Sequence, residues 1–404
     1  MKVICIGAGA AGLFFALNAS SKGVEVLVLD SNSKPGRKLA ITGKGRCNIT
    51  NKKLPREFLD HVVRNNNFLY SSLNAFTPFD TMEFFESHGC PLKVERGDRV
   101  FPVSDKSSDI IDTLVNECLA KNVVFKYNEQ VEKVEKVDEN FIVKTKSNTY
   151  VCDKLVIATG GASYTSTGSK GDGYKFAKSF NHKITEIKPS LCPIVIEEYI
   201  PKEMFDFTLK NVEITAKSKN FKKKIFGDLE FLNNRLTGPI ILTLSTLINR
   251  IEDDIELSLD FKPALNNEKL NNRILREINN APNNDVLYLL TKLLPNEIIK
   301  FFISHIDLDV KTKLNSFTKE DRNKLVKYLK EFKFTFISLD DLDRAVVTSG
   351  GVNVNEINQK SMESKIVKGL YFIGEVLDVD AQTGGYSLQI ALSTAYVASK
   401  NITK

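Results

Sequence analysis

The sequence predicts an α/β protein whose parallel sheet is interrupted by one large insert. The first thirty residues read as an apolar strand, a glycine turn, a helix and a second apolar strand. Short apolar runs that end in glycine return at 154–161 and 369–375. Between them, from Pro189 to about residue 335, the pattern changes to alternating strands and then to helices. One parallel sheet with a second region nested in it accounts for all three observations.

The N-terminal elements follow from local patterns. Lys2–Ile6 is an apolar run bounded by glycine, which is typical of a buried parallel strand. Ala10–Ser21 is rich in Ala, Leu and Phe and predicts a helix, and Val24–Leu29 predicts the next strand. Lys2 and the apolar residues after it also resemble a signal peptide. The second apolar strand, which ends in an acid, favours a βαβ unit instead.

The turn of this βαβ unit has the spacing of a dinucleotide-binding motif. Gly7, Gly9 and Gly12 form GxGxxG between the strand and the helix. Asp30 ends the second strand, where an acid accepts hydrogen bonds from ribose hydroxyls. Gly9 would let a pyrophosphate approach the helix N-terminus, whose free N–H groups and dipole attract anions. The alternative is a small-residue helix packed tightly on the sheet, which leaves Asp30 unexplained.

Patterns downstream predict further elements. Ser107–Lys121 places its apolar residues on one helical face. Strands are predicted at Val123–Tyr127, Val131–Val137, Phe141–Lys146 and Lys154–Ala158, and the second and third of these would form a hairpin.

These patterns divide the chain into four segments. We expect a nucleotide-binding domain split between residues 1–188 and 336–404. The insert would comprise a β-rich subdomain at 189–265, forming an antiparallel sheet or small barrel, and a helical subdomain at 266–335.

Composition limits the classes of function. The chain has 404 residues, 42% hydrophobic and 26% charged, which is ordinary for a globular protein. Six scattered cysteines without a CxxC pair, and four histidines, predict no metal site and no disulfide framework, and favour the cytoplasm. No apolar run is long enough to span a membrane.

The charge distribution leaves a polyanionic partner open. The formal net charge is +6, and basic residues cluster at Lys34–Arg64 and at Lys217–Lys224. The second cluster has a simpler interpretation as the solvated tip of a hairpin.

Two later motifs separate FAD from NAD as the cofactor. Leu155–Gly161 is a buried strand that ends in Ala-Thr-Gly-Gly, and Gly369–Glu375 is a strand that ends in Gly-Glu. Thr383–Tyr386 then introduces a helix at Ser387–Lys400. In flavoproteins of this architecture, the first motif passes near the adenosine half and the second meets the ribityl-phosphate. The late helix points its positive end at the pyrimidine edge of the flavin.

Several stretches then resemble one family of bacterial FAD-binding oxidoreductases, often labelled aminoacetone-oxidase-like, which includes the ribosomal RNA dihydrouridine synthase type. They are GRKLAITGKGRCNITN (36–51), RGDRVFPVS (96–104), 168–194, TSGGV (348–352), MESK (362–365) and GLYFIGEVLDVDAQTGGYSLQIA (369–391). The insert is less similar, because Asn233–Arg235 and Thr237 depart from the family pattern. Ser387 and Ala395 depart from it as well.

The resemblance implies a Rossmann-like FAD domain of the glutathione reductase type, with the insert lying over the flavin. It implies an FAD-dependent oxidoreductase, reduced by NAD(P)H, that passes hydride from flavin N5 to a C=C bond. The substrate we favour is a uracil of 23S ribosomal RNA. A small molecule, such as an aminoacetone-like amine or a steroid-like enone, is one alternative. A non-catalytic flavin-binding sensor or interaction module is another.

Together the motifs and the resemblance predict the residues that contact FAD. Arg37 or Lys38 would meet the pyrophosphate, and Arg46 with the 43–48 backbone would border the flavin ring. The expected contacts are Gly7, Gly9, Ala10, Ala11, Gly12, Asp30, Ser31, Arg37, Lys38, Gly43, Gly45, Arg46, Cys47, Asn48, Val131, Ala158, Thr159, Gly160, Gly161, Gly374, Glu375, Asp378, Gly384, Gly385, Tyr386, Ser387 and Leu388.

Cys47 is the candidate catalytic residue, and two interpretations of it stay open. It could donate the proton that accompanies hydride transfer. It could equally be a small apolar side chain fitted into a tight loop.

Overall fold

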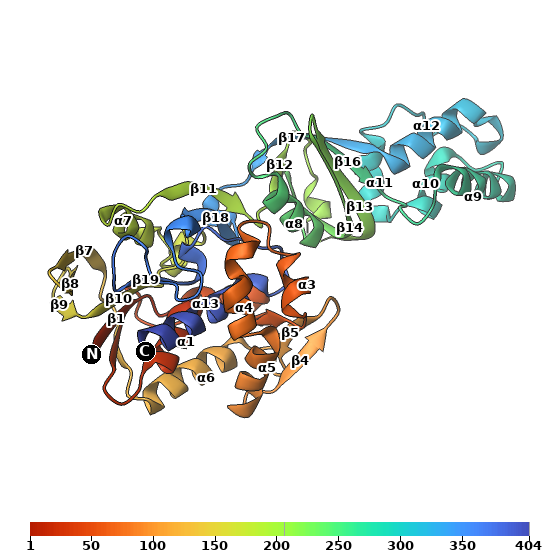
Figure 1. The fold of residues 1–404 in the computed structure, drawn as a ribbon. Helices are drawn as coiled ribbons and strands as arrows, with labels where there is room; N and C mark the ends of the chain where they lie inside the picture. Colours follow the sequence, from red (N-terminus) through yellow and green to blue (C-terminus); the bar gives the residue numbers. More distant parts are fainter. Residues whose placement is uncertain (206, 404) are drawn as a thin grey trace. The chain divides into compact units, whose positions relative to one another are not determined.

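The computed structural model describes residues 1–205 and 207–403. These residues form two compact units. One unit comprises Met1–Ser190 and Asp341–Lys404, and the other comprises Leu191–Asp340 (Figure 1). The second unit is therefore inserted in the chain of the first.

A five-stranded parallel sheet forms the centre of the first unit, in the order β19-β10-β1-β2-β6. The strands are β1 (Lys2–Ile6), β2 (Glu25–Leu29), β6 (Val124–Lys126), β10 (Lys154–Ile157) and β19 (Leu370–Phe372). All were predicted from their apolar runs. Because the strands are parallel, their carboxyl ends lie at one edge, and the glycine turn, Asp30 and both later motifs follow those ends.

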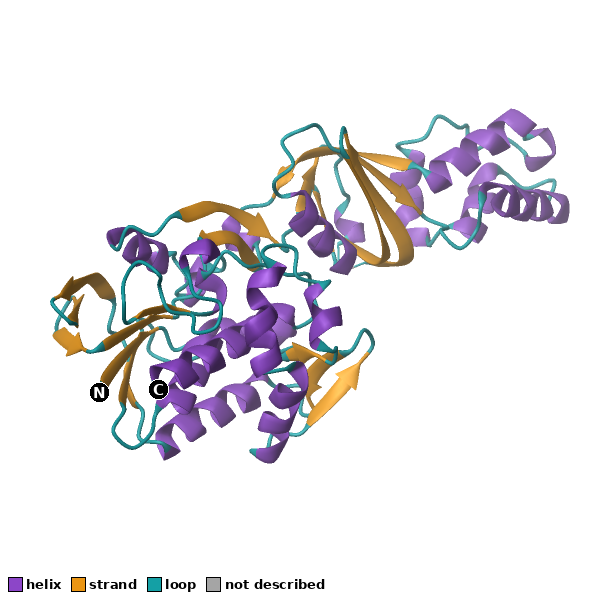
Figure 2. Cartoon of the chain, viewed as in Figure 1, coloured by secondary structure: helices purple, strands orange, loops and turns teal. Residues whose placement is uncertain are grey.

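Helices pack beside this sheet. α1 (Ala10–Ala19) contacts both α6 (Ser107–Ala120) and α13 (Tyr386–Ile402), and the three lie side by side in Figure 2. α1 is apolar all round, and most of its side chains are buried between the sheet and its neighbours. The remaining helices of this unit are α2 (Arg37–Ile41), α3 (Pro55–Leu59), α4 (Tyr70–Ala75), α5 (Pro78–Ser87) and α7 (Asp172–Ser179).

Three smaller antiparallel sheets complete the first unit. The predicted hairpin is present as β7 (Val131–Val137) and β8 (Asn140–Thr145), which β9 (Thr149–Cys152) extends. The others are β3 (Thr50–Asn51) with β5 (Arg99–Pro102) and β4 (Leu92–Glu95), and β11 (Ile184–Ser190) with β18 (Val347–Val352).

The second unit contains a closed barrel in the order β12-β15-β14-β13-β16-β17. Its strands are β12 (Ile194–Ile196), β13 (Thr208–Ser218), β14 (Phe221–Leu232), β15 (Arg235–Thr237), β16 (Glu256–Asp260) and β17 (Phe332–Leu339). Its helices are α8 (Pro239–Ile248), α9 (Asn267–Asn280), α10 (Val286–Leu293), α11 (Asn296–Ile303) and α12 (Lys319–Lys330). The sequence did not predict α8, whose run of Ile, Leu and Thr suits a strand equally well.

Two predicted boundaries are corrected by strand pairing. The boundary after residue 335 cuts β17, which pairs with both β12 and β16 and so closes the barrel. The boundary after residue 188 cuts β11, which pairs with β18 of the first unit. Local patterns locate strands, but only their partners decide to which unit a strand belongs.

The barrel and the helices after it share one apolar core. Phe301 of α11 lies close to Phe332 and Phe334 of β17, with ring centroids 5.8 Å and 6.3 Å away. Within residues 1–205 and 207–403, no helix is both long and apolar enough to cross a membrane. In the same residues, no three His, Cys, Asp or Glu side chains converge as a metal site would require.

Candidate cofactor and active site

The glycine turn after β1 is shaped by close backbone contacts. A methyl group on Gly7 would lie 2.4 Å from the carbonyl oxygen of Ala158, and one on Gly12 would lie 1.9 Å from that of Gly7. Both positions therefore require glycine. Gly9 differs, because a methyl group there would meet nothing within 4 Å. The space in front of Gly9 is thus open for a ligand to approach the backbone.

The N-terminus of α1 is prepared for an anion. Gly9 precedes the helix without a side-chain cap, and the first turn carries no acidic side chain. The first N–H groups of α1 have no partner within the helix. The side chains of Ala10 and Ala11 are too small to cover these groups. This arrangement fits the pyrophosphate of a dinucleotide.

Asp30 is fixed against the glycine turn. Its Oδ2 accepts a hydrogen bond from the Ala8 N–H at 2.7 Å, and its Oδ1 accepts one from the Asn32 N–H at 2.8 Å. The remaining lone pairs of the carboxylate suit ribose hydroxyls. Asn32, which the sequence analysis missed, also donates to the carbonyl of Thr167 at 3.1 Å. Ser31 is exposed beside it.

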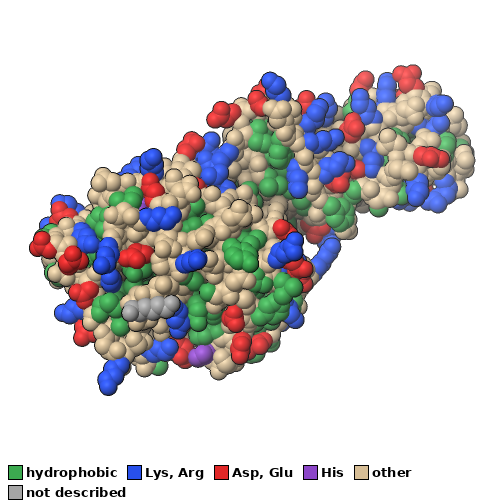
Figure 3. Space-filling model, in the orientation of Figure 1, with side chains coloured by type: hydrophobic (Ala, Val, Ile, Leu, Met, Phe, Trp, Pro, Cys, Tyr) green, Lys and Arg blue, Asp and Glu red, His purple; other side chains and the backbone are tan. Residues whose placement is uncertain are grey.

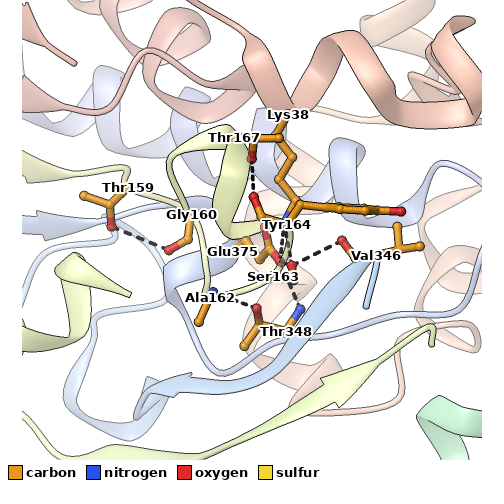
Figure 4. A network of polar contacts seen from close by, with 10 residues as sticks. All are labelled: Lys38, Thr159, Gly160, Ala162, Ser163, Tyr164, Thr167, Val346, Thr348 and Glu375. Atoms are coloured by element: carbon orange, nitrogen blue, oxygen red, sulfur yellow. Dashed lines mark hydrogen bonds and ion pairs between the residues drawn. The ribbon is translucent and has the colours of Figure 1, made fainter. Parts of the chain in front are cut away.

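A polar network joins three of the predicted motifs (Figure 4). The Lys38 ammonium donates to Glu375 at 2.7 Å and to Ser163 Oγ at 2.7 Å. The Thr348 N–H donates to Glu375 at 3.0 Å, and Thr348 Oγ1 accepts from the Ala162 N–H at 2.8 Å. The partner that the structure gives Lys38 is therefore a carboxylate of the Gly-Glu motif.

The Ala-Thr-Gly-Gly turn at 158–161 fits against this network. A methyl group on Gly161 would lie 2.4 Å from Thr348 Oγ1 and 3.0 Å from a Glu375 oxygen. One on Gly374 would lie 2.9 Å from Cβ of Ala11. Small residues thus bring the ends of β10 and β19 against the start of α1. Thr159 is half-buried, and Val131, the first residue of β7, is buried.

The loop at 36–51 runs along the whole candidate site. Its first residue, Gly36, donates to the carbonyl of Ala8 at 2.8 Å. Its last residue, Asn51, donates to the carbonyl of Gly384 at 3.0 Å. Left-handed conformations at Gly43, Lys44, Gly45 and Cys47 fold the segment between these contacts into a tight loop.

The N-terminus of α13 lies against the end of this loop. Gly385 adopts φ 94°, and a methyl group there would lie 2.4 Å from the carbonyl oxygen of Thr50. The first turn of α13 has no acidic side chain and no side-chain cap. Asn48 Oδ1 and Asn51 Oδ1 are buried, and no described residue donates a hydrogen bond to either. Unsatisfied acceptors near uncapped N–H groups fit the ring N–H and carbonyl groups of a flavin edge.

Buried polar contacts hold this helix start in position. Gln389 Oε1 accepts hydrogen bonds from Thr50 at 2.6 Å and Thr81 at 2.7 Å. Tyr386 stacks on His61 with ring centroids 4.6 Å apart. Ser387 and Leu388 are half-buried on the same turn. Gln389 was missed by the sequence analysis, although it lies in the GGYSLQ stretch.

Arg37 and Arg46 have partners other than those expected of them. The Arg37 guanidinium donates to Asn32 Oδ1 at 2.9 Å. Arg46 pairs with Asp105 at 2.7 Å and with Glu95, and its guanidinium lies 4.2 Å from the centre of the Phe101 ring. These contacts tie the loop to β4, β5 and the turn that follows them. The charge of Arg46 is therefore committed to two carboxylates.

Cys47 has no exposed surface. Burial raises the pKa of its thiol to about 12, so it stays protonated at neutral pH. A side chain with no accessible surface presents no atom to a bound molecule. This burial favours the interpretation of Cys47 as a packing residue. Cys90 is buried as well.

Replacement of Cys47 by serine is expected to retain bound FAD and at least about half of the turnover rate. Stability should fall by ~1–3 kcal/mol, because a buried hydroxyl replaces a thiol. Absorbance of the bound cofactor and steady-state kinetics are the measurements. A loss of turnover by a factor of about a hundred, with FAD still bound, would restore the proton-donor role.

Two buried acids, Asp378 and Asp380, lie close together in the loop before α13. Arg64 donates to both oxygens of Asp378, at 3.0 Å and 3.2 Å. Asp380 is 1% exposed, and its Oδ2 accepts from Ser190 at 3.2 Å. Burial raises the pKa of Asp380 to about 6, and Asp378 adds to this while Ser190, Ser349 and Arg64 oppose it.

This pKa shift predicts how stability depends on pH. In the folded protein Asp380 holds its proton up to about pH 6, so its contribution is full below its unfolded pKa and is lost as pH rises through 6. A shift of about two units corresponds to ~3 kcal/mol. Relative to wild type, Asp380→Asn should therefore gain about this amount between about pH 4 and about pH 7, as measured by urea unfolding. Exposed Asp60→Asn is the control, and a parallel pH profile for both variants would contradict the shift.

Comparison with known proteins places this site in a family. Residues 1–401 match the family described as the HI0933-like protein Rossmann domain. The chain belongs to the HI0933-like family. A relative from Escherichia coli (strain K12), named ribosomal RNA dihydrouridine synthase, is 32% identical over 401 residues, which cover 99% of this chain and 97% of the relative. A relative from Clostridium scindens, named 3-dehydro-bile acid delta(4,6)-reductase, is 26% identical over 408 residues, which cover 99% and 98%.

A solved structure shares the fold of this HI0933-like protein. The crystal structure of 3-ketosteroid-delta4-(5alpha)-dehydrogenase from Rhodococcus jostii in complex with 4-androstene-3,17-dione superimposes with a TM-score of 0.53 at 12% identity. The match covers 100% of this chain and 97% of the other. The predicted Rossmann-type FAD-binding domain is confirmed, and the protein is an FAD-dependent oxidoreductase. The alternative of a non-catalytic flavin-binding module is therefore set aside.

Proposed function

We propose that this protein reduces a uracil of large-subunit ribosomal RNA to dihydrouridine, with NADPH or NADH as the electron donor. The observation that carries the proposal is the likeness to the Escherichia coli relative of that name, at 32% identity over 99% of the chain. Bound FAD would supply the transfer of hydride from the donor to the C=C bond of the base. Such a reaction would take place in the cytoplasm. The six cysteines, all free, agree with this location because thiols stay reduced there.

The residues of the chain would hold the cofactor at four points. The first turn of α1, opened by Gly9, would bind the pyrophosphate, and Asp30 would bind the adenosine ribose. Glu375, held by Lys38, would face the ribityl chain. The first N–H groups of α13 and Asn48 Oδ1 would meet the pyrimidine edge of the ring, where the helix dipole stabilises negative charge.

The lysine-rich hairpin supports an RNA substrate better than the N-terminal basic cluster does. In the N-terminal cluster, four of the nine basic residues, Lys38, Arg46, Lys53 and Arg64, are ion-paired with carboxylates. Over the face shown in Figure 3, basic and acidic side chains are interspersed. In the hairpin of β13 and β14, Lys217 lies directly opposite Lys222, an arrangement that destabilises a sheet unless anions approach it.

Most lysines of this hairpin keep their charge available. Lys224 is paired with Glu213 at 2.8 Å. Within the described chain, Lys217, Lys219, Lys222 and Lys223 have no carboxylate partner. Phosphate groups of RNA are the natural counter-ions for such a group. The interpretation as a solvated hairpin tip is compatible with the same contacts.

Reduction of a small enone is the second candidate. The Clostridium scindens relative, named a bile acid reductase, matches 99% of the chain at 26% identity. Both candidates need the same cofactor and the same addition of hydride and a proton to a C=C bond. They differ in the size and charge of the substrate.

Ribosomal RNA from strains with and without the gene tests the proposal. Dihydrouridine content, measured by mass spectrometry of nucleosides, should fall by one residue per large subunit when the gene is deleted, and plasmid-borne wild type should restore it. Purified protein held without oxygen should lose its flavin absorbance on addition of NADPH or NADH. Unchanged dihydrouridine content in the deleted strain would remove the RNA substrate and leave the small-molecule candidate.

A further inference from the structure

A polar groove opens on the first unit beside the loop that carries Asp378. Its volume is about 670 Å³, and it is lined by Asn65–Phe68 and by residues of the segment 354–365. Its floor is apolar and buried, and is made of Phe68, Val354 and Ile357. Its walls carry five asparagines, one glutamine and two lysines, all exposed. We name it the amide groove.

The charge of the amide groove has a single sign. Among the described residues, the lining of the groove includes two lysines, Lys360 and Lys365, and no aspartate or glutamate. The segment 354–365 contains two acids, and both turn elsewhere. Glu356 accepts from His182 at 3.1 Å and from the Lys183 N–H at 2.9 Å. Glu363 accepts from the Gly369 N–H at 2.7 Å, so both carboxylates bind groups that do not line the groove.

The polar groups of the groove are available to a ligand. Lys365 donates to the carbonyl of Asn355 at 2.9 Å, which leaves further ammonium protons unused. Lys360 has no carboxylate partner in the part of the chain that the structure describes. The side-chain amides of Asn67 and Gln359 likewise make no hydrogen bond to a described residue. Each amide offers both donors and an acceptor, which is the chemistry that base edges and ribose hydroxyls require.

One wall of the groove is tied to the candidate site. Asn65 donates to the carbonyl of Asp378 at 2.6 Å, and the Val63 N–H donates to the carbonyl of Asp380 at 2.9 Å. Both acids precede Gly385 and the start of α13. A polymer bound in the groove would therefore lie beside the segment that leads to the flavin edge.

We propose that the amide groove binds a single strand of RNA next to the reacting uracil. This inference rests on the proposed function. Small ligands need sites that enclose most of their surface, whereas the walls here are exposed. A strand gains affinity from successive phosphates and bases in an open groove, so exposed lysines and amides suffice for it.

Fluorescence anisotropy with a labelled single-stranded RNA of about 12 nucleotides tests the inference, because it measures binding without turnover. Lys360→Glu is expected to weaken binding by about tenfold and to reduce the slope of log affinity against log salt by about one. Asn67→Asp should weaken binding in the same direction. Lys368→Glu is the matched control, since Lys368 is exposed in the same region but does not line the groove. Unfolding temperature and bound FAD should be unchanged in all three.

The outcomes separate this inference from the proposed function. Weaker binding in both groove variants, with the control unchanged, supports it. If wild type binds RNA and both groove variants bind it equally well, the inference is overturned while the RNA substrate stands. If Lys360→Glu raises KM for NADPH and leaves RNA affinity unchanged, the groove serves the donor and the inference is again overturned. If wild type binds no RNA, the proposed substrate itself is lost.

Discussion

Replacement of Gly9 by glutamate is expected to abolish FAD binding while leaving the protein folded. A Cβ atom at Gly9 meets no protein atom within 4 Å, so the backbone there accepts a side chain without a clash at its first atom. It places a negative charge at the N-terminus of α1, where the dipole tolerates an acid in the free protein. That charge would repel the pyrophosphate. The dissociation constant for FAD should rise at least a hundredfold, about 2.7 kcal/mol, as measured by titration of the apoprotein.

Gly12→Ala, in the same motif, is expected to lower the stability of the fold. Its methyl group would lie 1.9 Å from the carbonyl oxygen of Gly7, so helix α1 must move away from β1. Overpacking of this kind costs ~1–3 kcal/mol or more. Thermal unfolding of the apoproteins should therefore shift for Gly12→Ala and stay close to wild type for Gly9→Glu, because without FAD the comparison is free of ligand stabilisation. Equal loss of stability in both variants would show that the space at Gly9 is not open.

Replacement of Lys38 by methionine is expected to destabilise the protein by ~2–3 kcal/mol and to weaken FAD binding. Lys38 and Glu375 are only 21% and 20% exposed, and their side chains meet at 2.7 Å. Removal of the ammonium leaves Glu375 with Ser163 and the Thr348 N–H but without a counter-charge. An uncompensated, partly buried charge is costly. Urea unfolding of the apoprotein and FAD titration are the measurements.

A double variant isolates the ion pair. Lys38→Met with Glu375→Gln should regain about half of the lost stability, because the remaining amide is neutral. Lys53→Met is the control, since Asp98, its partner at 3.0 Å, is 51% exposed and such pairs contribute ~0–1 kcal/mol. Equal effects of Lys38→Met and Lys53→Met would show that the pair with Glu375 is a surface contact.

Much of this protein could be predicted from its sequence because the signals are local. The positions of the parallel strands along the chain follow from short apolar runs, and the glycine motif with Asp30 follows from backbone geometry at a tight turn. The order of the strands in the sheet came from the structure. The inserted strands were expected to form an antiparallel sheet or small barrel, and the structure shows a closed barrel. Its sixth strand, β17, was divided by a predicted boundary because a strand next to a helix has no local signal for its partner.

The sequence by itself determined a dinucleotide cofactor, since glycines at fixed spacing followed by Asp30 are typical of a dinucleotide-binding βαβ turn. The motifs at 155–161 and 369–375 then favoured FAD over NAD. Only the tertiary structure decided what the charged residues do, because their partners lie far away in the chain. Lys38 and Glu375 are 337 residues apart, and Arg46 is committed to Glu95 and Asp105. The basic, glycine-rich loop therefore binds carboxylates of its own chain through these side chains, and its backbone lies along the candidate flavin site. The tertiary structure also decided that Cys47 is buried, because the burial of a side chain depends on all the residues that pack around it.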